Sequence, residues 1–256
     1  MSKILLLNDT SDYHNGCAEV IKNFIFDDSI KTNDPIDIDF SNYRLVILNG
    51  EGTMHHCGVK RPNTIKFITA LRMAQQAGCE TQLLNTVWQD MTNDYDDVLR
   101  KCSVIEVRDV VSQRELSKKH RIASVVRPDR SILSDVSYTE YPQQNIYKGQ
   151  WFISPFEITL PYEEINIFKQ SWNEIVNRLR HAELLVTGRH HEAYAAIKAG
   201  CKFIVLPSNS YKNEGIYLNA GVRPINNLSM INNVLSGMYD TEFKAIREYY
   251  ENVSKF

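Results

Sequence analysis

Short apolar runs alternate with segments of helical periodicity along most of the chain. Each run ends in a polar or glycine-containing turn, which is typical of buried parallel strands. The strands expected in the first half cover 4–7, 37–40, 45–48, 82–87, 103–107 and 123–126. Between them, apolar residues recur at helical spacing, most clearly over 62–78, where Pro62 starts a helix and Gly78 ends it. This alternation predicts an α/β fold with a parallel sheet.

The second half of the chain repeats the alternation. We expect a strand, a long helix, a βαβ unit and two closing helices, at 151–155, about 162–180, 184–206, 231–238 and 242–253. Residues 138–148 are polar and aromatic without a clear period, so we expect a linker there. The predicted architecture is therefore two small Rossmann-like domains facing a cleft, one over residues 1–137 and one over 149–256 that also carries the C-terminal helices.

Composition narrows the class of protein. The chain has 256 residues, of which 43% are hydrophobic and 23% charged, as in ordinary globular proteins. A formal net charge of -2 gives no basic field, so we expect no nucleic-acid partner. The five cysteines form no CxxC pair and the apolar run 4–7 is too short to span a membrane, which together predict a soluble cytoplasmic protein. Work on envelope material at the cytoplasmic face would allow peripheral membrane association.

The segment from Thr187 to Ala193 concentrates the chemistry of the βαβ unit. It follows the strand 184–186 directly, and ligands of open α/β sheets bind at such carboxyl ends. Arg189 offers a planar fork to a phosphate or carboxylate, and the start of the helix adds backbone N–H donors. His190 or His191 can move a proton near neutral pH, and we favour His191. The alternative is that one of the two histidines only caps the helix or packs beneath it.

Other predicted strand ends also carry polar groups. They are Asn15-Gly16, Gly50-Glu51-Gly52-Thr53, Arg108-Asp109 and the segment from Ser208 to Gly215. Some of these residues can also serve the fold alone: the glycines around Glu51 can form a tight turn, and Asp109 can cap a helix. Taken together, these turns predict an anion-binding cleft.

We expect no metal ion and no cofactor. His55-His56-Cys57 and His190-His191 are rich in ligand atoms, but adjacent residues point apart on a strand or helix, whereas zinc sites use separated ligands. Cys57 is also a weak candidate for a nucleophile, because nothing nearby marks its thiol as activated.

These motifs resemble the polysaccharide pyruvyl transferase family. In the family's order, the chain has Asn15-Gly16-Cys17-Ala18, the loop from Asn49 to Thr53, Val107-Arg108-Asp109 with Ser112 and Leu116, Pro128-Asp129, Thr187 to His191, and Ser208 to Gly215. The resemblance covers roughly residues 8–220. It implies a GT-B-like fold with a donor-binding C-terminal domain. It also implies the transfer of a pyruvyl group from phosphoenolpyruvate to a saccharide acceptor, either free or lipid-linked, as a ketal in surface polysaccharide biosynthesis.

The resemblance assigns roles to residues of this chain. The catalytic set is His191 as acid, Glu51 or Asp129 as base, and Arg189. The donor would be bound by Arg108, Arg189, His190, Ser208, Asn209, Lys212 and Glu214, and the acceptor by Asn15, Gly16 and Thr53. Arginine and lysine suit a donor that carries both a phosphate and a carboxylate.

Two other functions stay open. Glu51 stands where the family often has glycine, and this extra acid favours a GT-B-type glycosyltransferase that uses a nucleotide-activated sugar, such as a CMP-linked 2-keto acid sugar. Glu214 would then hold ribose hydroxyls. The third possibility is a binding module without catalysis. The histidines and acids beside the cationic residues argue against it, because a binding module gains little from groups that transfer protons. The oligomeric state stays open as well.

Overall fold

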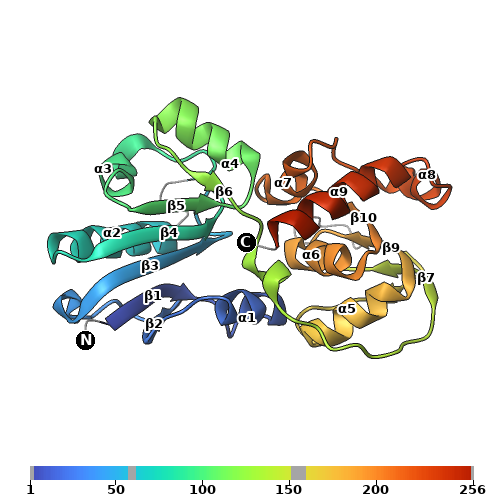
Figure 1. Cartoon of the computed structure of the whole chain (residues 1–256), viewed down its shortest axis with the longest axis horizontal. Helices are drawn as coiled ribbons and strands as arrows, with labels where there is room; N and C mark the ends of the chain where they lie inside the picture. Colours follow the sequence, from blue (N-terminus) through green and yellow to red (C-terminus); the bar gives the residue numbers. More distant parts are fainter. Residues whose placement is uncertain (1–2, 57–61, 151–159, 255–256) are drawn as a thin grey trace. The chain divides into compact units, whose positions relative to one another are not determined.

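The computed structural model describes residues 3–56, 62–150 and 160–254. Contacts within the chain divide it into two compact units. Unit 1 consists of Met1–Thr10 and Phe24–Arg127, and unit 2 of Ser11–Asn23 and Pro128–Phe256. Each unit is an α/β structure with its own parallel sheet and its own apolar core (Figure 1).

Unit 1 contains a six-stranded parallel sheet in the order β2-β1-β3-β4-β5-β6. Its strands are β1 (Lys3–Asp9), β2 (Asp28–Lys31), β3 (Tyr43–Glu51), β4 (Glu80–Thr86), β5 (Val104–Val107) and β6 (Val125–Val126). Its α-helices are α2 (Pro62–Gln76), α3 (Asp96–Leu99) and α4 (Val110–Glu115), with the 3₁₀ turns η1 (Phe40–Asn42) and η2 (Asn93–Tyr95) and the π-helical segment η3 (Leu116–His120). The continuous apolar runs of β1 and β3 are buried, as is usual in a parallel sheet that is covered on both faces.

Unit 2 contains a four-stranded parallel sheet in the order β10-β9-β7-β8. Its strands are β7 (Gln144–Lys148), β8 (Glu163–Glu164), β9 (Ala182–Thr187) and β10 (Lys202–Val205). Its helices are α1 (Asn15–Lys22), α5 (Trp172–Arg180), α6 (His190–Ala199), α7 (Lys212–Asn219), α8 (Ile231–Leu235) and α9 (Asp240–Val253), with turns η4 (Arg130–Leu133) and η5 (Leu228–Met230). Helix α6 is buried along most of its length, since α5, α9 and the sheet pack against it.

Both sheets have the strand order of doubly wound folds. The direction of winding reverses between β1 and β3 in unit 1 and between β7 and β9 in unit 2. In such sheets, ligands bind outside the carboxyl ends of the strands at the point of reversal. The ends of β1 and β3, and of β7 and β9, are therefore the positions in which the fold itself favours a site.

Most predicted strands of unit 1 are present, but the expected strand at 37–40 is wrong. The strand next to β1 is β2, and residues 35–39 belong to no strand. Pro35 has no N–H for a ladder, and the Asp39 side chain accepts a hydrogen bond from the Ser41 N–H, which starts η1.

Two expectations for unit 2 also need correction. The segment 138–148 is not wholly a linker, since its last residues form β7 between β9 and β8. The helix expected from about residue 162 begins only at Trp172, where Ser171 caps it by accepting from the Glu174 N–H. The strand expected at 151–155 lies outside the described residues.

The sequence predicted a single domain boundary near residue 138, whereas the two units exchange segments of the chain. Helix α1 and residues 128–137 belong to unit 2. The reason is packing: α1 lies against η4, α5 and α6, and its buried positions Cys17, Val20 and Ile21 face those elements. Within the described ranges, no helix combines the length and the apolar character that crossing a membrane requires.

Candidate functional site

The turn between β9 and α6 in unit 2 is built by hydrogen bonds around Thr187. The Thr187 hydroxyl oxygen accepts from the Arg189 N–H at 2.9 Å, and the hydroxyl donates to Glu192 Oε2 at 2.5 Å. Arg189 takes the N-cap position with extended backbone, so α6 starts at His190. The first turn of α6 therefore carries both histidines at the carboxyl end of β9, beside the reversal point of the sheet.

Glu192 is fully buried and ties this turn to two other segments. Its carboxylate accepts from the Gln150 N–H at 3.2 Å and from the Ile167 N–H at 3.4 Å. Burial raises the pKa of Glu192 to about 7, although the bonds from Thr187 and the backbone oppose that shift. A Cβ on Gly149 would come within 2.0 Å of Glu192 Oε2, so glycine is required for this close packing. Glu192 was not among the predicted site residues; its hydrogen bonds join the turn to the segments that contain Gln150 and Ile167.

Asp129 faces both histidines of the turn. It caps η4 with Oδ1, which accepts from the Ser131 N–H at 3.0 Å. Its Oδ2 atom lies 3.5 Å from Nε2 of His191 and 3.9 Å from Nε2 of His190. The Asp129 side chain is fully buried and the histidines nearly so. A carboxylate in contact with an imidazole is suited to orient the ring.

The start of α1 brings His14 and Cys17 to the same place. His14 caps α1, with Nδ1 accepting from the Cys17 N–H at 3.2 Å, and its ring meets the His191 ring edge to face at 5.0 Å. Burial, with the neighbouring His191 and Arg189, lowers the pKa of His14 to about 2, so this imidazole is neutral at physiological pH. Gly16 is also essential to the packing, because a Cβ there would lie 2.6 Å from the Cβ of His191.

Arg189 is half-buried and extends over an aromatic ring. Its guanidinium carbon lies 5.0 Å from the centre of the Phe168 ring, which meets Tyr13 edge to face. Both aromatic rings are substantially exposed. The guanidinium is thereby held near His14, with which it interacts electrostatically. Arg189 also stands at the N-terminal end of α6, where backbone N–H groups favour an anion.

The segment after β10 lies at the next carboxyl end of the same sheet. Lys212 opens α7, and its Nζ donates to Asn209 Oδ1 at 3.0 Å. Asn213 joins the two turns, because its Nδ2 donates to the carbonyls of Gly188 and Leu206. Ser208, Asn209, Lys212 and Glu214 are all half-buried.

Unit 1 contains the remaining predicted residues, Glu51, Thr53 and Arg108. Arg108 is almost fully buried, and its Nε donates to the carbonyl of Asn85 at 3.0 Å and to Oδ1 of Asn85 at 3.2 Å. Its Nη2 lies 4.0 Å from Glu51 Oε1. Thr53 is half-buried in the turn after β3, where its N–H donates to the Gly50 carbonyl.

A row of buried asparagines supports these residues of unit 1. Asn8 and Asn49 exchange hydrogen bonds between the ends of β1 and β3, and Asn85 Nδ2 donates to Asn49 Oδ1 at 3.0 Å. Asn8, Glu51 and Asn85 all have positive φ. Left-handed backbone at residues other than glycine persists where the surroundings hold it, and it is frequent at functional sites.

The structure therefore brings Asn15, Gly16, Asp129, Arg189, His190 and His191 together within unit 2, with the segment 208–214 at the neighbouring strand end. It places Glu51, Thr53 and Arg108 in unit 1. No role was predicted for His14, Cys17, Asn8, Asn49 or Asn85, although Cys17 and Asn49 lie within motifs of the family resemblance. A histidine before Asn15-Gly16 was a visible signal for the first, while single asparagines at strand ends give none.

No protein-family model matches the sequence, and no curated protein matches it either. Solved structures do share its fold. A protein of uncharacterized function from Klebsiella pneumoniae aligns with a TM-score of 0.59 at 15% identity, over 85% of this chain and 88% of that one. A UDP-N-acetylglucosamine 2-epimerase described as putative, from Listeria monocytogenes, aligns with a TM-score of 0.56 at 8% identity, over 96% and 90%.

A third similar structure is the UDP-GlcNAc 2-epimerase of Neisseria meningitidis bound to UDP-GlcNAc. Its TM-score is 0.52 at 11% identity, and the alignment covers 98% of this chain and 93% of that one. At these identities, the similarity concerns the fold. The predicted fold class is confirmed: the chain is a GT-B-like α/β protein with two Rossmann-like units and parallel sheets.

Proposed function

We propose that this chain is a sugar-modifying transferase that binds an anionic donor in unit 2 and moves its group to a saccharide. The observation that carries the proposal is the buried pair of Asp129 and His191, which lies beside Arg189 at the N-terminal end of α6. A cation, helix N–H groups and a group able to transfer a proton meet there at the reversal point of the sheet. Solved structures of similar fold are named as enzymes of nucleotide sugars, which supports a sugar substrate at the level of the fold.

The donor that we propose is phosphoenolpyruvate, and the reaction is pyruvyl transfer. Arg189 would bind the carboxylate or phosphate as a fork, and Lys212 would contribute a second positive charge from the neighbouring strand end. His191 would protonate the methylene carbon, which makes the adjacent carbon electrophilic. Oxygens of the saccharide then form the ketal at that carbon, their protons pass to a base, and phosphate leaves.

Asp129 is the base that the geometry of unit 2 favours. It contacts His191 directly, so it can hold the ring in place and accept a proton when the acceptor hydroxyl attacks. Glu51 stays a predicted alternative base in unit 1. Arg108 also stays a predicted donor ligand, although its guanidinium is already engaged by Asn85. Asn15, Gly16 and Thr53 stay the predicted acceptor residues, and a cytoplasmic location stays a prediction.

The second candidate is a glycosyltransferase that uses a nucleotide-activated sugar. It is favoured by one observation, the fold shared with a UDP-GlcNAc 2-epimerase that was crystallised with UDP-GlcNAc. In this case Arg189 and Lys212 would bind the phosphates, and Glu214 on the first turn of α7 would hold the ribose.

Calorimetric titration separates the two candidates. Phosphoenolpyruvate, CMP and UDP are titrated into the wild type, Arg189→Ala and the control Arg247→Ala. Arg247 donates to the Gly200 carbonyl at the other end of α6, roughly 15 Å along the helix axis from its first turn. Phosphoenolpyruvate binding that is lost in Arg189→Ala and kept in Arg247→Ala is the expected result. Binding of a nucleotide alone would favour glycosyl transfer, and binding of none of the three would contradict both donors.

A further inference from the structure

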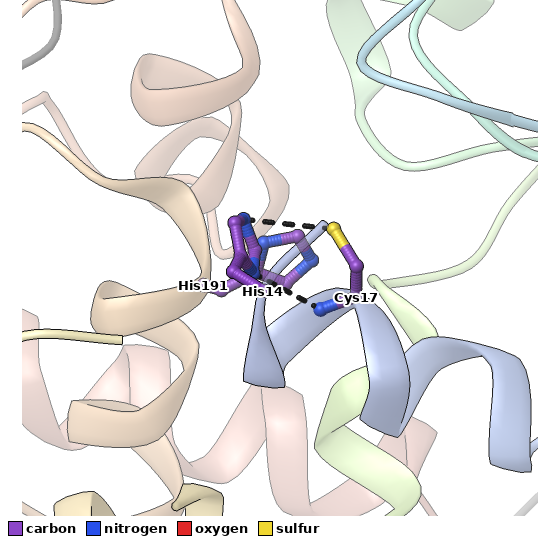
Figure 2. Close-up of side chains that lie close together, drawn as sticks. All are labelled: His14, Cys17 and His191. Carbon is purple, nitrogen blue, oxygen red and sulfur yellow. Dashed lines mark hydrogen bonds between the residues drawn. The ribbon is translucent and has the colours of Figure 1, made fainter. Parts of the chain in front are cut away.

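His14, Cys17 and His191 form a cluster of three metal-ligating side chains in unit 2. Figure 2 shows the two imidazoles and the thiol close together, with His14 and Cys17 from the start of α1 and His191 from α6. One ligand atom from each residue lies within 4.8 Å of the other two. Cys17 and His191 are buried and His14 is half-buried.

The separation of the ligand atoms fits a tetrahedral ion. His14 Nε2 lies 3.5 Å from Cys17 Sγ. With zinc bonds of about 2.0 Å to nitrogen and about 2.3 Å to sulfur, tetrahedral geometry separates the two ligand atoms by about 3.5 Å. The sequence predicted no metal ion because the histidines of each pair are adjacent and point apart. The cluster avoids that difficulty because it takes one histidine of the pair and two residues from another helix.

The surroundings supply charge and a supporting contact. Asp129 Oδ2 lies 3.5 Å from His191 Nε2, and a carboxylate beside a ligating histidine is the usual arrangement around zinc. A Cys17 thiolate and the Asp129 carboxylate together balance the charge of a divalent cation. The positive charge of Arg189 next to the cluster opposes binding, which argues for moderate rather than very tight affinity.

We propose that His14, Cys17 and His191 bind one thiophilic divalent cation of the zinc type, and that the bound ion inhibits the protein reversibly. Binding joins the metal to sulfur and to both imidazoles, and the thiol proton leaves to solvent. The His14 proton moves to Nδ1, which gives up the hydrogen bond from the Cys17 N–H. The metal therefore competes with an existing helix cap. The inhibition rests on the proposed function, because the bound ion occupies the His191 ring that would transfer the proton. The binding of the ion does not depend on the proposed function.

Cobalt provides the direct test of the site. The chelator-treated full chain is titrated with Co²⁺ and the absorption spectrum is recorded, followed by displacement with Zn²⁺. We expect one ion per chain, with a thiolate-to-cobalt charge-transfer band and tetrahedral d–d bands. Both features should be lost in Cys17→Ala and in His14→Gln, and kept in the controls Cys102→Ala and His181→Gln. Circular dichroism shows whether each variant is folded, and the two ligand variants test the site independently.

Absence of the charge-transfer band in the wild type, or its retention in Cys17→Ala, would overturn the site. The consequence for function has its own readout: Zn²⁺ should abolish turnover at one equivalent, and EDTA should restore it. Metal that binds without inhibition would overturn the inhibitory role. Donor calorimetry on the metal-free protein tests the proposed function separately, so failure of the metal site and failure of the donor assignment can be distinguished.

Discussion

The Oδ2 atom of Asp129 lies 3.5 Å from Nε2 of His191, and the carboxylate is fully buried. The pair is held from both sides, since Oδ1 of Asp129 caps η4 and His191 packs against Gly16. A carboxylate in this position can orient the imidazole that we propose as the proton donor.

Asp129→Asn should therefore reduce turnover far more than stability. The amide keeps the size of the side chain and can still accept from the Ser131 N–H through its oxygen, but it removes the negative charge beside His191. Since acid–base groups contribute about 10²–10⁴-fold, we expect kcat to fall by at least about 100-fold, with unfolding free energy lowered by about 1 kcal/mol. Steady-state kinetics measures kcat, and urea unfolding measures the free energy of unfolding. Asp135→Asn, an exposed aspartate of the same unit, is the matched control; equal losses in the two variants would argue against a specific role.

Gly16→Ala tests whether Gly16 acts by allowing close approach rather than by binding the acceptor. The new Cβ would lie 2.6 Å from the Cβ of His191 and 2.8 Å from Cδ1 of Ile167. Overpacking of this kind typically costs about 1–3 kcal/mol, so the midpoint of urea unfolding should fall and the His191 ring should shift. The effect on kcat should accompany the loss of stability. Lys22→Ala, on the exposed side of the same helix, should be neutral. A Gly16→Ala protein of wild-type stability would show that the neighbouring side chains can move aside.

The described cysteines Cys102 and Cys201 should be inert toward iodoacetamide in the folded protein. Burial raises the pKa of Cys102 to about 11 and that of Cys201 to about 12. Since the thiolate is the nucleophile, only about one molecule in a thousand is reactive at Cys102 at pH 8, and about one in ten thousand at Cys201. Each rise of one pH unit should increase the alkylation rate about tenfold while the protein stays folded. Mass spectrometry of the labelled peptides measures each site. Rapid labelling of Cys201 below pH 8 would contradict its burial.

The apolar runs predicted most of the central strands because a strand buried on both faces must be continuously hydrophobic. Edge strands were harder to predict: β2 contains Asp28, Ser29 and Lys31, so nothing in its composition distinguishes it from a loop. The strand β7 is not an edge strand, but it was also hard to predict, since only Ile146 and Tyr147 in it are buried. Short polar strands gain their order from the pairing partner, which a single sequence does not display.

For the candidate site, the turn from Thr187 to His191 was predictable because strand, glycine and helix start lie together in sequence. The contacts of His191 with His14 and Asp129 were not, since these residues are more than 60 positions apart from it and meet through the packing of α1 and η4 on α6. Asp129 was identified only through the resemblance to a family. His14 was missed although it stands directly before Asn15-Gly16, because the sequence alone does not show which side chains meet it.

Asn85 offers a way to measure the backbone strain in unit 1. Its φ of 54° is in the left-handed region, and its side chain and carbonyl both accept from Arg108 Nε. Asn85→Ala removes the side-chain bonds to Arg108 and Asn49 and keeps a Cβ in a left-handed position, so we expect a loss of about 2–4 kcal/mol. Asn85→Gly loses the same bonds without that penalty, and it should be about 1 kcal/mol more stable than Asn85→Ala.

Urea unfolding of the two Asn85 variants measures this difference directly, because the lost hydrogen bonds cancel between them. Gln82→Ala and Gln82→Gly, at a half-buried position of β4 with ordinary backbone, are the matched pair, and there glycine should be the less stable variant. The order of alanine and glycine should therefore invert between the two positions. If glycine were also the less stable residue at position 85, the left-handed backbone there would not be a source of strain, and the asparagine would be retained for its hydrogen bonds to Arg108 and Asn49 alone.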